Sequence, residues 1–190
     1  MGSKAYLAKP IFREESPEDV ENWSGFFIGG MAQTNELSLA RAYKSAGDVI
    51  VAKALRSIDL AYEWAFPALF LYRHAIELYL KLIVQPEKPT HGIMKLTRQF
   101  KSLVRSRLKK ETPEWVIDRI REFSDIDPVS QTFRYTTKGD GSHNWVPGEF
   151  WVSFVHLRRT VNELAKGFEN AYFALPREPR PSKSKTKRST

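Results

Sequence analysis

The chain has 190 residues, of which 42% are hydrophobic and 13% aromatic, and it carries a formal net charge of +8. This length and composition are typical of a globular domain with a substantial core, and they exclude a wholly disordered chain. The sequence contains no cysteine, which excludes a disulfide framework, a thiolate nucleophile and a thiolate metal site.

The positive charge is concentrated at the C-terminal end. Residues 176–190 (PREPRPSKSKTKRST) hold six Lys or Arg against one Glu, which is +5 of the total of +8 and leaves +3 for the rest of the chain. We expect a disordered basic tail there, because the segment is rich in Pro, Ser and Lys and has no apolar side chain to hold it. Such a tail can attract RNA or DNA weakly, or it can simply keep the protein soluble.

The most hydrophobic region, residues 60–84, does not have the pattern of a membrane span. A proline and several charged or titratable side chains interrupt it, at Glu63, Pro67, Arg73, His74, Glu77 and Lys81. A membrane span requires roughly 20 nearly uncharged residues in a row, and the sequence shows no secretory signal peptide. We therefore expect a cytoplasmic protein that does not engage a membrane.

In chain order, residues 1–33 are predicted to form an N-terminal arm. The segment SPEDVENW within it is typical of a short helix, with Ser16 as the N-cap and Pro17 in the first turn. We expect the arm to pack on the rest of the protein through Trp23, Phe26 and Phe27.

Two long helices are predicted next. Residues 34–57 place apolar side chains at helical spacing, and Thr34 is the expected N-cap. The second helix is expected to begin near Pro67, because proline suits a first turn and not a helix interior. It should end near Val84, before the two prolines of QPEKPT.

Residues 91–110 predict a third helix with two different faces. One face is apolar and consists of Ile93, Leu96, Phe100, Leu103 and Val104. The opposite face is basic and consists of Arg98, Lys101, Arg105 and Lys109. The basic face can follow a phosphate backbone, or it can be an ordinary solvated surface.

A fourth helix is predicted over residues 113–125, followed by a loop or small hairpin over residues 131–148 (QTFRYTTKGDGSHNWVPG). The inward side chains of the fourth helix are expected to be Trp115, Val116, Ile120 and Phe123. The last helix is expected to open at Pro147 and to run to about Tyr172. Its core candidates are Phe150, Val152, Phe154, Leu157, Val161, Leu164 and Phe168. Residues 34–175 are thus predicted to form an all-α bundle of about five helices.

The second helix carries a stripe of polar residues in an otherwise apolar surface. At 100° per residue, Arg73, His74, Glu77 and Lys81 fall within a sector of about 100°. The stripe can be a structural network of ion pairs one turn apart. Alternatively it can face a cleft, where Arg73 binds a phosphate and His74 transfers protons. A metal site is not expected, because a second carboxylate–histidine motif of the kind that di-metal bundles use is missing.

The segments RHAIELYLKLI and FSDIDPVSQTFRY, with His91 between them at the start of a helix, resemble the HEPN superfamily (higher eukaryotes and prokaryotes nucleotide-binding). The resemblance covers about residues 34–173. It implies a helical bundle of four or five helices that forms a homodimer, and a role in prokaryotic defence or toxin–antitoxin systems. Many members are metal-independent ribonucleases that need no cofactor. Their active site is an Arg followed by a His four to six residues later, at the start of the last helix.

This sequence departs from that pattern, because the nearest pair is Arg134 and His143, with eight residues between them. They are the catalytic candidates, since the glycines of the loop can fold them together. Arg73, His74, Glu77, Arg98, Lys101 and Arg105 are the candidates for substrate binding. The expected partners are RNA or a nucleotide, a second copy of the chain, and an antitoxin or other protein. The alternative is a catalytically silent helical module that binds a protein or dimerises.

Overall fold

The structure is a computed structural model that describes residues 34–56, 61–138, 140–143, 146 and 148–175, together with Glu21. The chain divides into two units, Met1–Thr34 and Asn35–Thr190. The expectations for the N-terminal arm, for the basic tail and for Pro147 lie outside the described residues.

The described residues form five α-helices and a single π-helical turn, and they contain no strand. In chain order the elements are α2 (Glu36–Arg56), α3 (Ala61–Val84), α4 (Ile93–Leu103), the π-helical turn η3 (Val104–Leu108), α5 (Glu114–Ile126) and α6 (Phe154–Ala174). The predicted all-α bundle of about five helices is confirmed. None of the described helices combines the length and the apolar character that crossing a bilayer requires.

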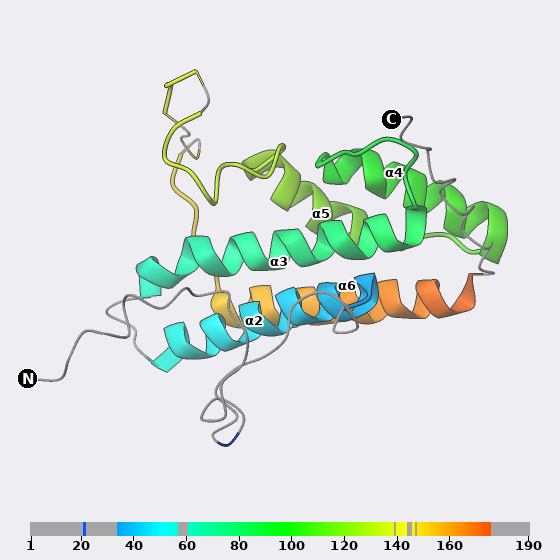
Figure 1. The fold of residues 1–190 in the computed structure, drawn as a ribbon, viewed down its shortest axis with the longest axis horizontal. Helices are drawn as coiled ribbons and strands as arrows, with labels where there is room; N and C mark the ends of the chain where they lie inside the picture. Colours follow the sequence, from blue (N-terminus) through cyan, green and yellow to red (C-terminus); the bar gives the residue numbers. More distant parts are fainter. Residues whose placement is uncertain are drawn as a thin grey trace, which may run out of the picture. The chain divides into compact units, whose positions relative to one another are not determined.

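Helix α3 lies at the centre of this unit. Figure 1 shows α2 and α6 along one side of α3, and α4 and α5 along the other. The central position explains the sequence of α3, because a helix that contacts neighbours on most of its circumference must be apolar on most of its circumference. The polar stripe of α3 is the exception, and it lies toward the segments that precede α4 and follow α5.

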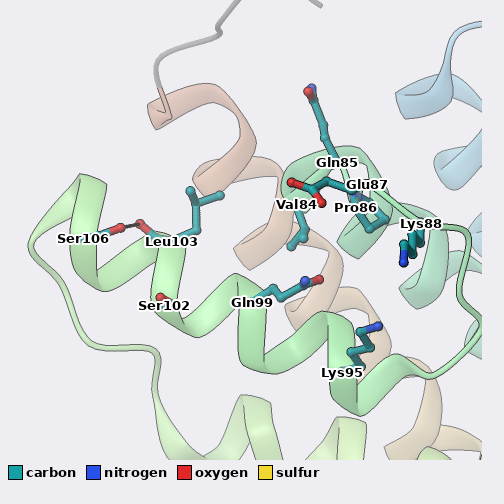
Figure 2. Close-up of a pocket in the computed structure, with 10 residues that line it drawn as sticks. All are labelled: Val84, Gln85, Pro86, Glu87, Lys88, Lys95, Gln99, Ser102, Leu103 and Ser106. Atoms are coloured by element: carbon teal, nitrogen blue, oxygen red, sulfur yellow. Dashed lines mark hydrogen bonds between the residues drawn. The ribbon is translucent and has the colours of Figure 1, made fainter.

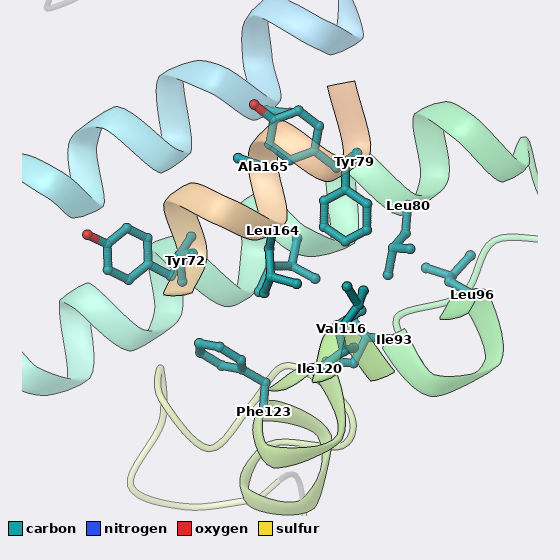
Figure 3. Close-up of a cluster of buried hydrophobic side chains, with 14 of the residues drawn as sticks. Tyr72, Tyr79, Leu80, Ile93, Leu96, Val116, Ile120, Phe123, Leu164 and Ala165 are labelled. Carbon is teal, nitrogen blue, oxygen red and sulfur yellow. The ribbon is translucent and has the colours of Figure 1, made fainter. Parts of the chain in front are cut away.

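The core is continuous across the layers. Tyr79 of α3 stacks on Phe168 of α6 with 5.7 Å between ring centroids, and Phe168 meets Phe100 of α4 edge-on at 5.5 Å. Figure 3 shows the surrounding side chains, which come from α3, α4, α5 and α6. Full burial of such side chains stabilises the fold by about 1.5–3 kcal/mol each, so this core holds α3, α4 and α6 together.

Helices α2 and α3 approach most closely at Gly47. A Cβ atom at Gly47 would lie 2.6 Å from the ring of Tyr72, a distance that real side chains do not adopt. Tyr72 is fully buried, and its hydroxyl donates to the carboxylate of Asp48 at 2.8 Å. The absence of a side chain at Gly47 therefore makes room for the Tyr72 ring.

Three predicted helix starts are corrected by the structure. The first helix is capped by Asn35 and not Thr34, since the Asn35 side chain accepts the main-chain N–H of Ser38 at 2.8 Å. Helix α3 begins at Ala61, so Pro67 lies inside it. The last helix begins at Phe154 with Ser153 as its cap, at 3.3 Å from the main-chain nitrogen of His156.

Pro67 lies inside α3, six residues after its first residue Ala61. Proline removes one main-chain hydrogen bond, here the one to the carbonyl of Glu63. The turn before Pro67 is held by another contact, because the Lys53 ammonium of α2 lies 4.2 Å from the centre of the Trp64 ring. The predicted start near Pro67 is therefore wrong.

Some predicted core residues are exposed. Trp115 is 45% exposed, whereas its neighbour Ile117 is buried and takes the inward position on α5. Phe150 is 60% exposed and Val152 37% exposed. Both precede the true start of α6, so the helical spacing used to place them inward does not apply.

The segment before α6 contains the predicted turn, but among the described residues its two sides are joined by a single antiparallel bridge and not by a hairpin of paired strands. Thr137 and His143 form a single antiparallel bridge, and the amide of Lys138 donates to the carbonyl of Ser142 at 2.7 Å. Gly141 has a φ of 81°, which glycine adopts without strain.

Candidate functional site

Arg73 and Glu77, one turn apart on α3, form an ion pair in the interior. Both side chains are 0% exposed, and Nη1 of Arg73 donates to Oε2 of Glu77 at 3.0 Å. Arg73 also donates from Nε to the main-chain oxygen of Asp127 at 2.8 Å, and from Nη2 to that of His91 at 3.0 Å. These bonds tie α3 to the turn after α5 and to the connection before α4. We assign Arg73 a structural role, because a substrate in solvent cannot reach it in this arrangement.

Asp127 organises the turn that follows α5. Its Oδ1 accepts the amides of Gln131 at 2.6 Å and Thr132 at 3.0 Å, and its Oδ2 lies 3.3 Å from Nε of Arg73. The turn passes through Ser130, which has a left-handed φ of 63°. The DIDP segment thus ends α5 and also supplies a buried carboxylate to the charges on α3.

Glu77 holds two groups that solvent can reach. Its Oε1 accepts from Nζ of Lys81 at 2.6 Å and lies 2.9 Å from Nδ1 of His91. The His91 side chain is 65% exposed and the Lys81 side chain 28%, whereas Glu77 is fully buried. We call Arg73, Glu77, Lys81 and His91 the Glu77 cluster.

The charge of Glu77 is set by its partners. Burial alone would raise the pKa of Glu77, but the hydrogen bond and attraction from Lys81, with the hydrogen bonds from His91 and Arg73, lower the pKa overall. Glu77 is therefore ionised at neutral pH and acts as an acceptor. In a neutral His91 the proton must then lie on Nδ1, which leaves Nε2 as a proton acceptor on a mostly exposed ring.

His74 lies beside the Glu77 cluster on α3 and is partly buried. Its ring meets Tyr43 of α2 edge-on at 4.4 Å and stacks on Phe70 at 5.7 Å. Burial lowers the pKa of His74, and the attraction of Glu77 only partly opposes this. His74 is therefore a neutral imidazole at pH 7.

Arg134 follows α5 and packs against the Phe70 ring, which also contacts His74. Its Nε and Nη2 both donate to the main-chain oxygen of Ser130. Its guanidinium carbon lies 5.4 Å from the centre of the Phe70 ring and 5.2 Å from that of Tyr135. His74 also packs on Phe70, so Arg134 and His74 contact the same ring, although they are 60 residues apart in sequence.

His143 is exposed and belongs to the far side of the turn. It pairs with Thr137 in the antiparallel bridge, and Arg134 contacts α3 and its own turn. Arg134 and His74 thus share the Phe70 ring, and the catalytic pairing of Arg134 with His143 stays a prediction.

The basic face of the third helix is partly neutralised. Lys101 lies 3.8 Å from Glu114, and Arg105 lies 3.1 Å from Glu111. Arg98 is exposed and has no acidic partner within the described ranges. Exposed pairs of this kind contribute about 0–1 kcal/mol and are screened by salt, so they do not prevent these side chains from meeting a phosphate.

An apolar groove lies between α3, α5 and the segment before α6. It has a volume of about 360 Å³ and is lined by apolar side chains that include Phe66, Leu69 and Phe123. Trp151 lies at its edge and is 95% exposed, and Phe150 is 60% exposed. Exposed aromatic residues beside an apolar groove are typical of a protein-binding surface.

Within the part of the chain that the structure describes, no group of three His, Asp or Glu side chains is placed to hold a metal ion. Comparison with family models, with curated proteins and with solved structures found no match. The resemblance to HEPN proteins therefore depends on the quoted sequence segments.

Sequence reasoning did not select His91 or Asp127 as site residues. The stripe on α3 indicated that Glu77 has partners, but helical spacing finds only those on the same helix. His91 is 14 positions and Asp127 is 50 positions from Glu77. The available signal was weak: each is a polar residue beside a predicted helix end.

Proposed function

We propose that this protein is a HEPN-like helical protein that binds RNA and cleaves it without a metal ion, in a prokaryotic defence or toxin–antitoxin role. The observation that carries the proposal is the hydrogen bond between the exposed His91 ring and the buried Glu77 carboxylate, beside Lys81. A buried carboxylate that fixes the tautomer of an exposed imidazole is the arrangement that proton transfer requires.

The chemistry follows from these groups. Nε2 of His91 takes the proton of a ribose 2′-hydroxyl, the 2′-oxygen attacks the adjacent phosphorus, and the 5′-oxygen leaves with a proton from water or a second acid. The products are a 2′,3′-cyclic phosphate and a 5′-hydroxyl. Lys81 donates only one of its three N–H groups to Glu77, so the others are free to stabilise the extra negative charge on the phosphorane.

The residues around Phe70 support binding of the RNA chain. Arg134 is exposed and keeps N–H groups that can reach a phosphate. Tyr135, at 54% exposed, offers a ring on which a base can stack. Arg98, Lys101 and Arg105 add positive charge on α4 and η3.

The test is cleavage of several RNAs in EDTA by the wild type and by His91→Ala, His74→Ala and His143→Ala variants, with a mock purification. We expect His91→Ala to lose about 100-fold or more in rate, as general acid–base groups do. His156→Ala is the matched control, because it removes an exposed histidine on α6. Loss confined to His143→Ala would place the chemistry in the loop, and loss confined to His74→Ala would place it at Phe70. No cleavage by the pure wild type would contradict the proposal.

The second candidate function is a silent module that dimerises or binds a protein such as an antitoxin. The apolar groove with Trp151 at its edge favours it. Sedimentation equilibrium of the wild type and of Trp151→Ser tests the homodimer, with Val49→Ser as a control on an exposed part of α2. We expect Trp151→Ser alone to weaken self-association by about tenfold or more, as loss of an aromatic hot spot does. A wild type that stays monomeric would contradict dimerisation through this groove.

A further inference from the structure

A second groove, more polar than the first, lies where α3 ends and α4 runs past it. It has a volume of about 540 Å³, and its walls are the residues that end α3, the connection after it, and one face of α4 and η3. Figure 2 shows its lining, which contains neither His91 nor any other member of the Glu77 cluster. We call it the polar groove.

The lining of the polar groove carries a net positive charge. Lys88 on the connection and Lys95 on α4 both line it, and both are exposed. Among the described residues neither lysine has an ion pair. Glu87 is the acidic residue in the lining, and Figure 2 shows its carboxylate directed away from Lys88. Two lysines against one glutamate leave the lining net positive.

The location of Lys95 adds to this. It lies in the first turn of α4, a helix that has no acidic residue in that turn and no side-chain cap at Gly92. The N-terminus of a helix carries partial positive charge and favours anions. A lysine there is unfavourable unless a negative group lies nearby, and Lys95 forms no ion pair with any residue that the structure describes.

The other end of the polar groove is neutral and hydrogen-bonding. Gln99, Ser102 and Ser106 follow Lys95 along the same face at spacings of three and four residues. In the described part of the chain, Gln99 and Ser102 make no side-chain hydrogen bond, and Ser106 donates to the carbonyl of Leu103 at 3.2 Å and can still accept. From Lys95 to Ser106 the face extends about 16 Å at 1.5 Å per residue.

Both walls of the groove have irregular backbone. Gln85 takes a left-handed φ of 49° where α3 ends. Ser106 belongs to η3, where the α-helical pattern changes to a π-helical one. The π-helical turn follows α4, and its C-cap, Lys109, has a left-handed φ of 55°.

We propose that the polar groove binds a small phosphate ester with a hydroxyl-rich body, of the class of sugar phosphates and nucleoside monophosphates. Lys88 and Lys95 hold the phosphate at the N-terminus of α4. Gln99, Ser102 and Ser106 hydrogen-bond to the uncharged body along the helix. The length of the face fits a molecule of this size. We propose binding of the ester without any chemical reaction.

Isothermal titration calorimetry with the full chain tests the proposal. The probes are ribose 5-phosphate, adenosine 5′-monophosphate, inorganic phosphate and adenosine, each at up to millimolar concentration. We expect one or both phosphate esters to bind, and Lys88→Ala with Lys95→Ala to weaken that binding by about tenfold or more through loss of the charged hydrogen bonds. Gln99→Ala should weaken the binding of the esters but not the binding of inorganic phosphate. Lys166→Ala is the matched control, since it removes one exposed charge on α6.

Whichever ester binds more tightly identifies the body that the groove accepts. No binding of either ester overturns the proposal, as does equal binding by wild type and the double lysine variant. Binding of adenosine as tight as that of its monophosphate also overturns it. Binding of a short RNA through the two lysines without binding of either ester would replace the small molecule with the RNA backbone. The calorimetric readout does not depend on RNA cleavage, so the two proposals fail separately.

Discussion

Arg73 is fully buried and donates hydrogen bonds to Glu77, Asp127 and His91. Loss of a partner of Arg73 should therefore lower the free energy of unfolding. Removing one member of a buried ion pair leaves an uncompensated charge in a poorly solvated place. We predict that Glu77→Ala lowers the free energy of unfolding by about 3 kcal/mol or more, measured by urea denaturation.

Glu163→Ala is the comparison for that variant. It breaks the exposed pair with Lys166 on α6 and should cost less than about 0.5 kcal/mol. If Glu77→Ala cost no more than Glu163→Ala, the structural role of the Glu77 cluster would be wrong.

His74 makes stability depend on pH in a defined direction. Burial keeps the pKa of His74 below its usual value of 6.5 in the folded protein. The unfolded chain therefore binds a proton at a pH where the folded protein does not, so the stability present above pH 6.5 is lost as the pH falls through the folded pKa. Glu77 opposes the shift, and Lys81, Arg134 and Arg73 reinforce it.

We predict that the urea midpoint falls between about pH 7.5 and pH 5.5, and that His74→Phe reduces this fall. Phenylalanine keeps an aromatic ring against Phe70 and Tyr43 but cannot titrate. The other histidines are common to both proteins and cancel in the comparison. An equal fall in wild type and variant would exclude His74 as the source.

At the scale of helices, two glycines in different helices should respond in opposite ways to substitution by alanine. Alanine is favoured over glycine in a helix by about 1 kcal/mol. At Gly167 on α6 nothing lies within 4 Å of an added Cβ, so Gly167→Ala should stabilise by about 0.5–1 kcal/mol. At Gly47 the added Cβ meets the Tyr72 ring at 2.6 Å, and overpacking costs about 1–3 kcal/mol.

We therefore predict that Gly47→Ala lowers the thermal midpoint and Gly167→Ala raises it. Calorimetry of the two variants beside the wild type measures both shifts. Two shifts of the same sign would mean that Tyr72 moves aside easily and that α2 and α3 are not held as closely as described.

The helices themselves were largely predictable, but three of their starts were not. Apolar spacing identifies α2, α4 and α5 because a core-facing stripe is a property of the local sequence. Capping depends on which side chain is within reach of the free amides, so Thr34 and Asn35 could not be separated without coordinates. At Pro67 the preference of proline for a first turn did not locate the start of α3, because the helix continues from Ala61 through Pro67.

At the scale of the whole molecule, the site combines segments that local patterns cannot connect. The sequence predicted that Arg73, Glu77 and Lys81 share one face of a helix, and they do. That the face is buried, and that Asp127 and His91 complete it, follows from how α4 and α5 pack against α3. Likewise, only the folded chain places Arg134 against Phe70 and His74.

The bonds of Arg73 also have a consequence for local opening. The turn at residues 127–132 has no regular secondary structure, yet its amides at Gln131 and Thr132 are bonded to Asp127, which is bonded to Arg73. This turn can open only if the buried charges on α3 lose their partner, so it should belong to the same cooperative unit as α3. We expect amide hydrogen exchange at Gln131 and Thr132 to be nearly as slow as in α3, and much slower than at Gly141 in the exposed turn. An irregular loop would then report on global unfolding.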